Sequence, residues 1–147
     1  MIINLLLDEA YPLISAILAM VIAQSLKIIF ISFREKSFRV SSLFSSGGMP
    51  SSHAAMVVGL STAIGLTEGF FSNIFYVCAI FSFVVLYDAT GVRHAAGKHA
   101  SILNRLIADF IAKDKFQHAK LTEILGHSPL EVCIGALIGI ASATLLF

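Results

Sequence analysis

Four long apolar stretches occupy most of this chain of 147 residues. They run over residues 11–33, 54–71, 73–92 and 129–147. Each is a candidate transmembrane helix, because a helix needs on the order of 20 residues to cross about 30 Å of hydrocarbon. The second and fourth are short, and local thinning of the bilayer can accommodate a short span. We therefore expect an all-α polytopic membrane bundle with four transmembrane helices, built as a single domain over residues 1–147.

The composition agrees with a membrane location and excludes other classes of protein. Hydrophobic residues make up 57% of the chain and charged residues 13%, whereas soluble domains average roughly 45–50% apolar and about 25% charged. So few charges cannot cover a soluble fold, and a chain this apolar is not disordered. The net charge of +1 gives no basis for a nucleic-acid partner, because such proteins concentrate Lys and Arg on one face. Cys78 and Cys133 each lie inside an apolar run, where we expect buried thiols and no disulfide framework.

The basic residues predict which side of the membrane each connection faces. Apart from Lys27, every Lys and Arg falls within residues 34–39 or 93–120. By the positive-inside rule both of these connections are cytoplasmic, and both termini lie outside. The first eleven residues contain no Lys or Arg, so we interpret the first stretch as a retained span of a plasma-membrane protein and not as a signal peptide. Apolar residues at helical spacing over residues 100–116 predict an amphipathic helix at the cytoplasmic surface.

Ionisable side chains gather at those ends of the predicted spans that face the basic side. Such groups are costly at membrane depth, which makes them candidates for a functional site. They are Lys27, Arg34, His53, Asp88, Arg93, His127 and Glu131. A Gly/Ser-rich segment that precedes the second span adds backbone donors around Ser51 and Ser52. Cations, imidazoles and backbone N–H groups at one face form a plausible receptor for a phosphate group, and we expect Asp88 to support it by pairing with Arg93.

Three short patterns in these residues resemble those of a known superfamily. Lys27 and Arg34 are separated by six residues, residues 50–53 read Pro-Ser-Ser-His, and His127 is followed four positions later by Glu131. The chain thereby resembles the type 2 phosphatidic acid phosphatase superfamily, and more closely its small divergent branch. These proteins are relatives of acid phosphatases and vanadium-dependent haloperoxidases. The superfamily motifs have Pro after the arginine, Gly in Pro-Ser-Gly-His and Asp after the last histidine. The arginine of the third motif would fall at Leu121, and we expect Arg93 to replace it.

This resemblance implies a membrane-embedded phosphatase that acts on a lipid phosphate or diphosphate without a metal or other cofactor. His127 would be the nucleophile that forms a phosphohistidine, and Glu131 would orient its imidazole. His53 would serve as general acid and then as general base. Lys27, Arg34 and Arg93, with the N–H groups around Ser51 and Ser52, would bind the phosphate oxygens. Because superfamily members normally build the site within six helices, a homodimer would complete a fold of four spans.

Less specific interpretations of the same residues stay open. Lys27 and Arg34 can be interfacial anchors, and Ser128 with Glu131 can be a capping box that starts a helix. Gly135 and Gly139 form a Gly-x-x-x-Gly pattern that favours close helix packing or dimerisation. The chain can accordingly be a non-catalytic membrane protein that binds a phosphorylated lipid, or an assembly subunit. The response of hydrolysis to substitution of His127 separates an enzyme from these alternatives.

Overall fold

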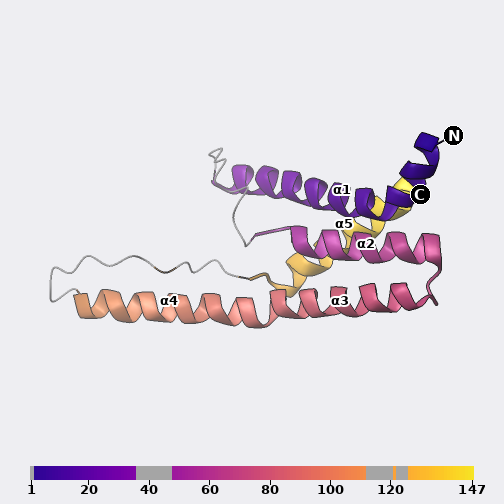
Figure 1. Ribbon diagram of the computed structural model, residues 1–147. Coiled ribbons are helices and arrows are strands. Elements are labelled where there is room, and N and C mark those ends of the chain that lie inside the picture. The colour runs from indigo at the N-terminus through magenta and orange to yellow at the C-terminus, as the bar shows by residue number, and fades with distance from the viewer. Residues whose placement is uncertain (1, 36–47, 112–120, 122–125) are drawn as a thin grey trace.

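The computed structural model of the chain describes residues 2–35, 48–111, 121 and 126–147. Within these ranges the regular structure is helical and contains no strand. The helices are α1 (Ile2–Glu35), α2 (Ser52–Glu68), α3 (Asn73–Thr90), α4 (Val92–Ile111) and α5 (Pro129–Leu146) (Figure 1). The all-α fold expected from the sequence is therefore confirmed.

Serine caps determine where three of the helices begin. Ser51, Ser72 and Ser128 precede α2, α3 and α5, and the hydroxyl of each accepts a hydrogen bond from the backbone N–H three residues later. An N-cap of this kind satisfies a backbone donor that has no partner within the helix. Pro129 then occupies the first turn of α5, where the missing N–H of proline costs nothing.

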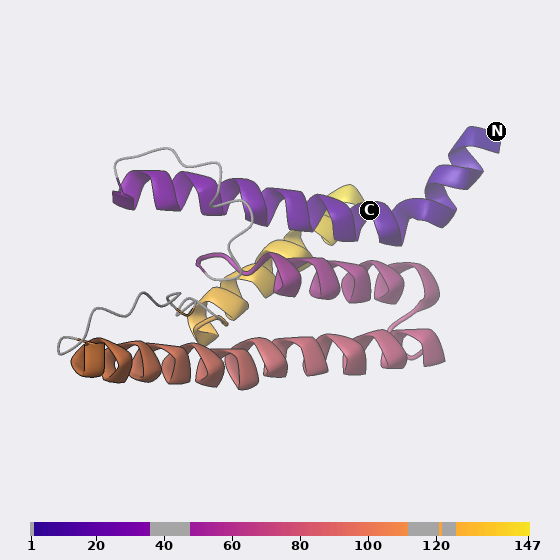
Figure 2. The same cartoon turned by 60° about the vertical axis from the view of Figure 1, so that its left-hand side comes forward.

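Within the described part of the chain, three segments are long and apolar enough to cross a membrane: Ala10–Phe33 in α1, Asn73–Ala108 in α3 and α4, and Pro129–Leu146 in α5. They correspond to the first, third and fourth predicted spans, so the chain is a helical membrane bundle. α2 has only 17 residues, and its crossing stays a prediction. α1 begins earlier than expected and contains Pro12. The first turns of this helix bend away from the rest (Figure 2), as expected where proline removes a helical hydrogen bond.

α2 occupies the centre of the bundle and contacts α1, α3 and α5 (Figures 1 and 2). The contact with α1 is made by small side chains, with Ala19 and Ala23 packed against Ala55. The contact with α3 includes a buried polar pair, because the Ser61 and Ser82 hydroxyls lie 2.8 Å apart and Ser82 donates to the Val57 carbonyl. Small residues thus let the helices approach closely, while hydroxyl groups join them.

The Gly-x-x-x-Gly pattern of α5 packs against α2 of the same chain. A Cβ atom at Gly135 would collide with the carbonyl oxygen of Ser51, and one at Gly139 would collide with that of Ala55. Glycine is therefore required at both positions for the two backbones to approach this closely. Of the two interpretations of this pattern, the structure supports close helix packing, since α2 already occupies this face of α5.

The amphipathic helix differs from its predicted position. α4 begins at Val92 and not near residue 100, directly after Gly91, and it continues in nearly the same direction as α3 (Figures 1 and 2). The hydrogen bonds from Gly91 N–H to the Tyr87 carbonyl and from Ala95 N–H to the Gly91 carbonyl explain this, because they carry the helical pattern across the glycine. Residues 112–116 of the predicted helix lie outside the described residues.

Candidate functional site

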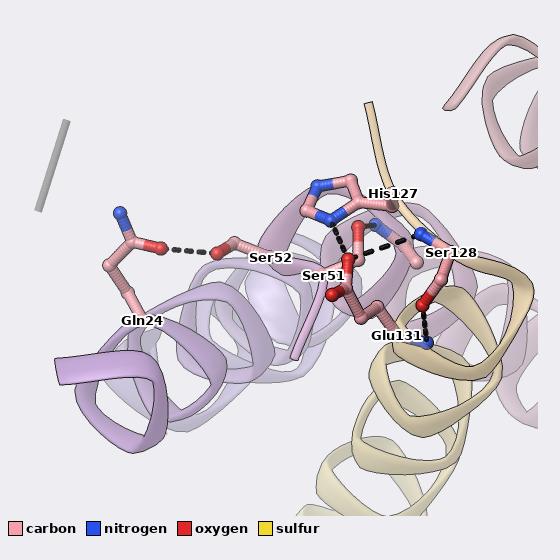
Figure 3. A network of polar contacts seen from close by, with 7 residues as sticks. Gln24, Ser51, Ser52, His127, Ser128 and Glu131 are labelled. Atoms are coloured by element: carbon pink, nitrogen blue, oxygen red, sulfur yellow. Dashed lines mark hydrogen bonds and ion pairs between the residues drawn. The ribbon is translucent and has the colours of Figure 1, made fainter. Parts of the chain in front are cut away.

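The imidazole of His127 and the carboxylate of Glu131 lie together at the start of α5 (Figure 3). His127 Nδ1 is 3.0 Å from Glu131 Oε2, and the His127 side chain is only 3% exposed. The same Oε2 accepts a hydrogen bond from the Ser128 backbone N–H at 3.2 Å, while the Ser128 hydroxyl accepts one from the Glu131 N–H. Glu131 therefore completes the predicted capping box and contacts the predicted nucleophile with one carboxylate.

Backbone hydrogen bonds hold this pair against two other helices. The Ser51 N–H donates to the Glu131 carbonyl oxygen at 3.0 Å, which joins the start of α2 to the first turn of α5. The His127 N–H donates to the Ala89 carbonyl oxygen at 3.0 Å, which joins it to the end of α3. The Ser51 hydroxyl accepts from the Ala54 N–H. The polar groups of Ser51 thus serve the assembly of the site.

Lys27 and His53 lie beside a cavity between α1 and α2. The cavity has a volume of about 410 Å³, and its lining includes Met20, Val21, Gln24, Lys27, Ser52 and His53. Lys27 is 2% exposed, and Gly48 lies close to the aliphatic part of its side chain. Gly48 has a φ of +97°, a backbone conformation that favours glycine. The buried residue Lys27 therefore lines a space that is large enough for part of a ligand.

Electrostatic interactions connect residues of α1, α2, α4 and α5 around His127. Burial lowers the pKa of the His127 imidazole below its ordinary value of 6.5, whereas the hydrogen bond to Glu131 acts in the opposite direction. The positive charges of Lys27 and Arg93 also lower the pKa of His127. His53 interacts electrostatically with the same two cations and with His127. Because the neutral form of His127 is favoured, this imidazole has a lone pair available near neutral pH.

Arg93 forms the ion pair predicted with Asp88. Arg93 Nε lies 2.6 Å from Asp88 Oδ2, and the two side chains are 54% and 38% exposed. This contact uses one of the five guanidinium N–H donors. Arg34 lies in the last turn of α1, but its side chain is outside the described part of the structure. Leu121, at the position of the third-motif arginine, is bound through its backbone N–H and carbonyl to Asn104 of α4.

Two contributors to the site were not singled out from the sequence. Gln24 accepts a hydrogen bond from the Ser52 hydroxyl (Figure 3), although the sequence shows it only as a polar interruption of an apolar stretch. Its position three residues before Lys27 could have indicated that it lies beside Lys27, since residues three apart share a helix face. Gly126 has a φ of +83°, and a Cβ there would collide with the backbone at Arg93 and His94. This close approach places Gly126, directly before His127, against the start of α4.

Among the described residues, no group of three or more His, Cys, Asp or Glu side chains is arranged to hold a metal ion. The metal-independent chemistry implied by the resemblance stays a prediction. The described residues instead bring together an imidazole, a carboxylate and cations, which is a set suited to binding and attacking a phosphate group.

Comparison with known proteins agrees with the resemblance in the motifs. The chain is 40% identical over 141 residues to an "Uncharacterized membrane protein YuiD" of Bacillus subtilis (strain 168). The aligned region covers 88% of this chain and 89% of the relative. No solved structure matches the chain significantly. Residues 9–142 match the model of the family described as "Divergent PAP2 family". This protein, with its apolar helices, is thus an integral membrane protein that belongs to the divergent PAP2 family.

Proposed function

We propose that this protein is a membrane phosphatase that hydrolyses a lipid phosphate or diphosphate through a phosphohistidine on His127. The observation that carries the proposal is the contact between His127 Nδ1 and Glu131 Oε2 at 3.0 Å. When Nδ1–H donates to the carboxylate, the lone pair of the imidazole lies on Nε2, at the other side of the ring. An imidazole that is held in this tautomer is an oriented nucleophile.

The proposed reaction has two steps. In the first step, His127 Nε2 attacks phosphorus, the bond between phosphorus and the lipid oxygen breaks, and His53 gives a proton to the leaving oxygen. In the second step, water attacks phosphorus, the bond between phosphorus and His127 Nε2 breaks, His53 takes a proton from the water, and inorganic phosphate leaves. Glu131 stabilises the positive charge that develops on the imidazole of His127.

Cations near the two histidines support this chemistry. Lys27 and Arg93 interact electrostatically with both His53 and His127, so an anionic group between the imidazoles lies within their field. In phosphoryl transfer, positioning and charge stabilisation supply most of the rate acceleration. We assign Arg34 and the backbone N–H groups around Ser51 and Ser52 to the same phosphate on the motif resemblance. The Ser51 N–H already donates to Glu131, so its contribution would require that this bond be exchanged.

The location of the cavity favours a lipid as the substrate. Met20 and Val21 precede Lys27 on α1 and line the same cavity, and Val21 is 50% exposed. In a bilayer this exposed side faces hydrocarbon, so an acyl or prenyl chain can enter from the side while the phosphate stays near Lys27. By the distribution of basic residues, we place the site at the cytoplasmic face of the plasma membrane.

Phosphate release from a panel of lipid monophosphates and diphosphates tests the proposal. The full-length protein is purified in detergent and assayed without added metal, beside His127→Ala and the matched control His99→Ala, which changes an exposed histidine of α4. We expect release by the wild type and by His99→Ala, and none by His127→Ala. If the folded wild type binds vanadate or phosphate but releases no phosphate from any lipid, the protein is a non-catalytic binder.

A further inference from the structure

A polar pair lies in the cavity between α1 and α2, one helical turn from Lys27. Ser52 is 7% exposed, and its hydroxyl donates a hydrogen bond to Oε1 of Gln24 (Figure 3). Both residues line the cavity together with Lys27 and His53. Neither side chain has a part in the reaction proposed above. The Ser52 hydroxyl is also absent from the Pro-Ser-Gly-His pattern that this segment resembles, because glycine stands at that position.

The residues of α1 that line the cavity form an ordered series along the helix. Gln24 precedes Lys27 by three residues, which is about 4.5 Å along the axis, and Met20 precedes it by seven residues, which is about 10 Å. The series therefore changes from a cation to an amide and then to an apolar side chain. It runs from the end of α1 where Lys27 lies toward the middle of the apolar stretch Ala10–Phe33.

This series matches the order of chemical groups in a lipid built on glycerol phosphate. The phosphate is followed first by glycerol oxygens and then by a hydrocarbon chain. A prenyl or simple alkyl phosphate has hydrocarbon directly after the phosphate, and that hydrocarbon would press against the polar atoms of Ser52 and Gln24. Burying polar groups against hydrocarbon without a new hydrogen bond costs free energy.

We infer that Ser52, held by Gln24, selects substrates that carry a hydroxyl on the carbon next to the phosphate-bearing carbon, as in a monoacylglycerol phosphate. The inference rests on the proposed function and names its substrate class. The Ser52 hydroxyl donates to Gln24, and its oxygen has a second lone pair with which to accept from the substrate hydroxyl. Gln24 acts through Ser52 and is a positioning residue, because it fixes the direction of the serine hydroxyl.

A pair of substrates that differ by one hydroxyl tests the inference. The probes are oleoyl lysophosphatidic acid and its deoxy analogue, in which propane-1,3-diol replaces glycerol. The proteins are full-length wild type, Ser52→Ala, Gln24→Leu and the control Thr62→Val. Thr62 lies on α2, and its hydroxyl donates to the Val58 carbonyl of the same helix. The measured quantity is the ratio of kcat/KM for the two probes, with the thermal unfolding midpoint as a check on folding.

We expect the wild type and Thr62→Val to prefer lysophosphatidic acid by about tenfold, which is the upper range for one neutral hydrogen bond. Ser52→Ala should bring the ratio near one, and Gln24→Leu should lower it by a smaller factor. A merely structural role of Ser52 would lower the rates with both probes and leave their ratio unchanged. A wild-type ratio near one, or an unchanged ratio in Ser52→Ala, overturns the inference while the proposed phosphatase activity stands.

Failure of the proposed function gives a different result. If the wild type releases phosphate from neither probe, the phosphatase proposal fails, and the dissociation constants of both probes are then measured by competition with a fluorescent lipid phosphate. The same tenfold preference, lost in Ser52→Ala, would retain the selection by Ser52 in a binding protein. Equal dissociation constants for the two probes would overturn it.

Discussion

Glu131 Oε2 lies 3.0 Å from Nδ1 of His127, and the same oxygen accepts the Ser128 N–H. The orientation of His127 and the capping of α5 therefore share one carboxylate oxygen. Substitutions at Glu131 and at Ser128 separate the two roles. Glu131→Gln keeps the size of the side chain but removes its charge. We expect phosphate release to fall by roughly 10⁴, the size of the loss seen when the carboxylate behind a catalytic histidine is neutralised or removed. The measurement is the rate of release at saturating substrate.

Ser128→Ala is the matched control for the capping role. It removes the hydroxyl that accepts the Glu131 N–H and leaves the carboxylate in place. Loss of an N-cap hydroxyl costs about 1 kcal/mol of stability, so the unfolding midpoint should fall while most of the activity is retained. Equal losses of activity in Ser128→Ala and Glu131→Gln would contradict a catalytic role for the carboxylate and would favour a purely structural one.

The pH dependence of the reaction should report the charges around His127. Burial and the charge of Lys27 lower the pKa of this imidazole, and Glu131 raises it. Because the neutral form is the nucleophile, activity should persist below pH 6.5 and be lost as the pH falls through the lowered pKa. Glu131→Gln should move this acid limb to lower pH, and Lys27→Met should move it to higher pH. Both variants are expected to be slow, so the position of the acid limb is compared and not the rate itself. If the acid limbs of Glu131→Gln and Lys27→Met shift in the same direction, the pKa of His127 is not set by these two charges.

Much of the fold could be predicted because polar residues mark the ends of the helices. The expected starts at Asn73 and Pro129 agree with α3 and α5, since Ser72 and Ser128 are recognisable caps. The start of α4 was predicted wrongly. Gly91 and the basic residues after it are typical of a break, but the Ala95 N–H reaches the Gly91 carbonyl and continues the helical turn. A single sequence does not reveal whether a glycine ends a helix or is accommodated within it.

The site could be predicted in part, through residue types at matching ends of the spans. The pairing of His127 with Glu131 was predicted from their spacing of four residues, although His127 lies just before the N-cap Ser128 and so outside α5. The bonds from His127 N–H to Ala89 and from Ser52 to Gln24 could not be predicted. They join backbone or side-chain groups that are distant in the chain, and their register depends on how closely small residues let the helices pack.

Substitution of the α5 glycines should destabilise the protein itself and not a dimer. At Gly135 and Gly139 an added methyl group meets the α2 backbone, which cannot yield as a flexible side chain does. We expect Gly135→Ala or Gly139→Ala to cost about 1–3 kcal/mol, the usual range for overpacking. Thermal unfolding in detergent measures the loss, and Leu137→Ala, at a 64% exposed position of the same helix, should have little effect. A changed oligomeric state with unchanged stability would instead support dimerisation.

The ion pair between Asp88 and Arg93 should matter more for substrate binding than for stability. Both side chains are partly exposed, and exposed ion pairs contribute about 0–1 kcal/mol. Asp88→Asn should therefore leave the unfolding midpoint nearly unchanged. Because the Arg93 guanidinium is then no longer held in place, KM should rise more than kcat falls. Arg93→Lys should do the same, because an ammonium group lacks the planar set of donors. An unchanged KM in both variants would remove Arg93 from the phosphate site.

The orientation of the site can be measured by cysteine labelling, because the chain has only two native cysteines. In a background with Cys78→Ala and Cys133→Ala, Ser46→Cys probes the connection before α2, and Phe71→Cys probes the turn between α2 and α3, where Phe71 is 90% exposed. The positive-inside rule places Ser46 in the cytoplasm and Phe71 outside. A membrane-impermeant maleimide should label Phe71→Cys in intact cells and Ser46→Cys only after permeabilisation. The reverse pattern would place the histidines outside, where they would act on lipids of the other leaflet, whereas labelling of both in intact cells would show that α2 does not cross the membrane.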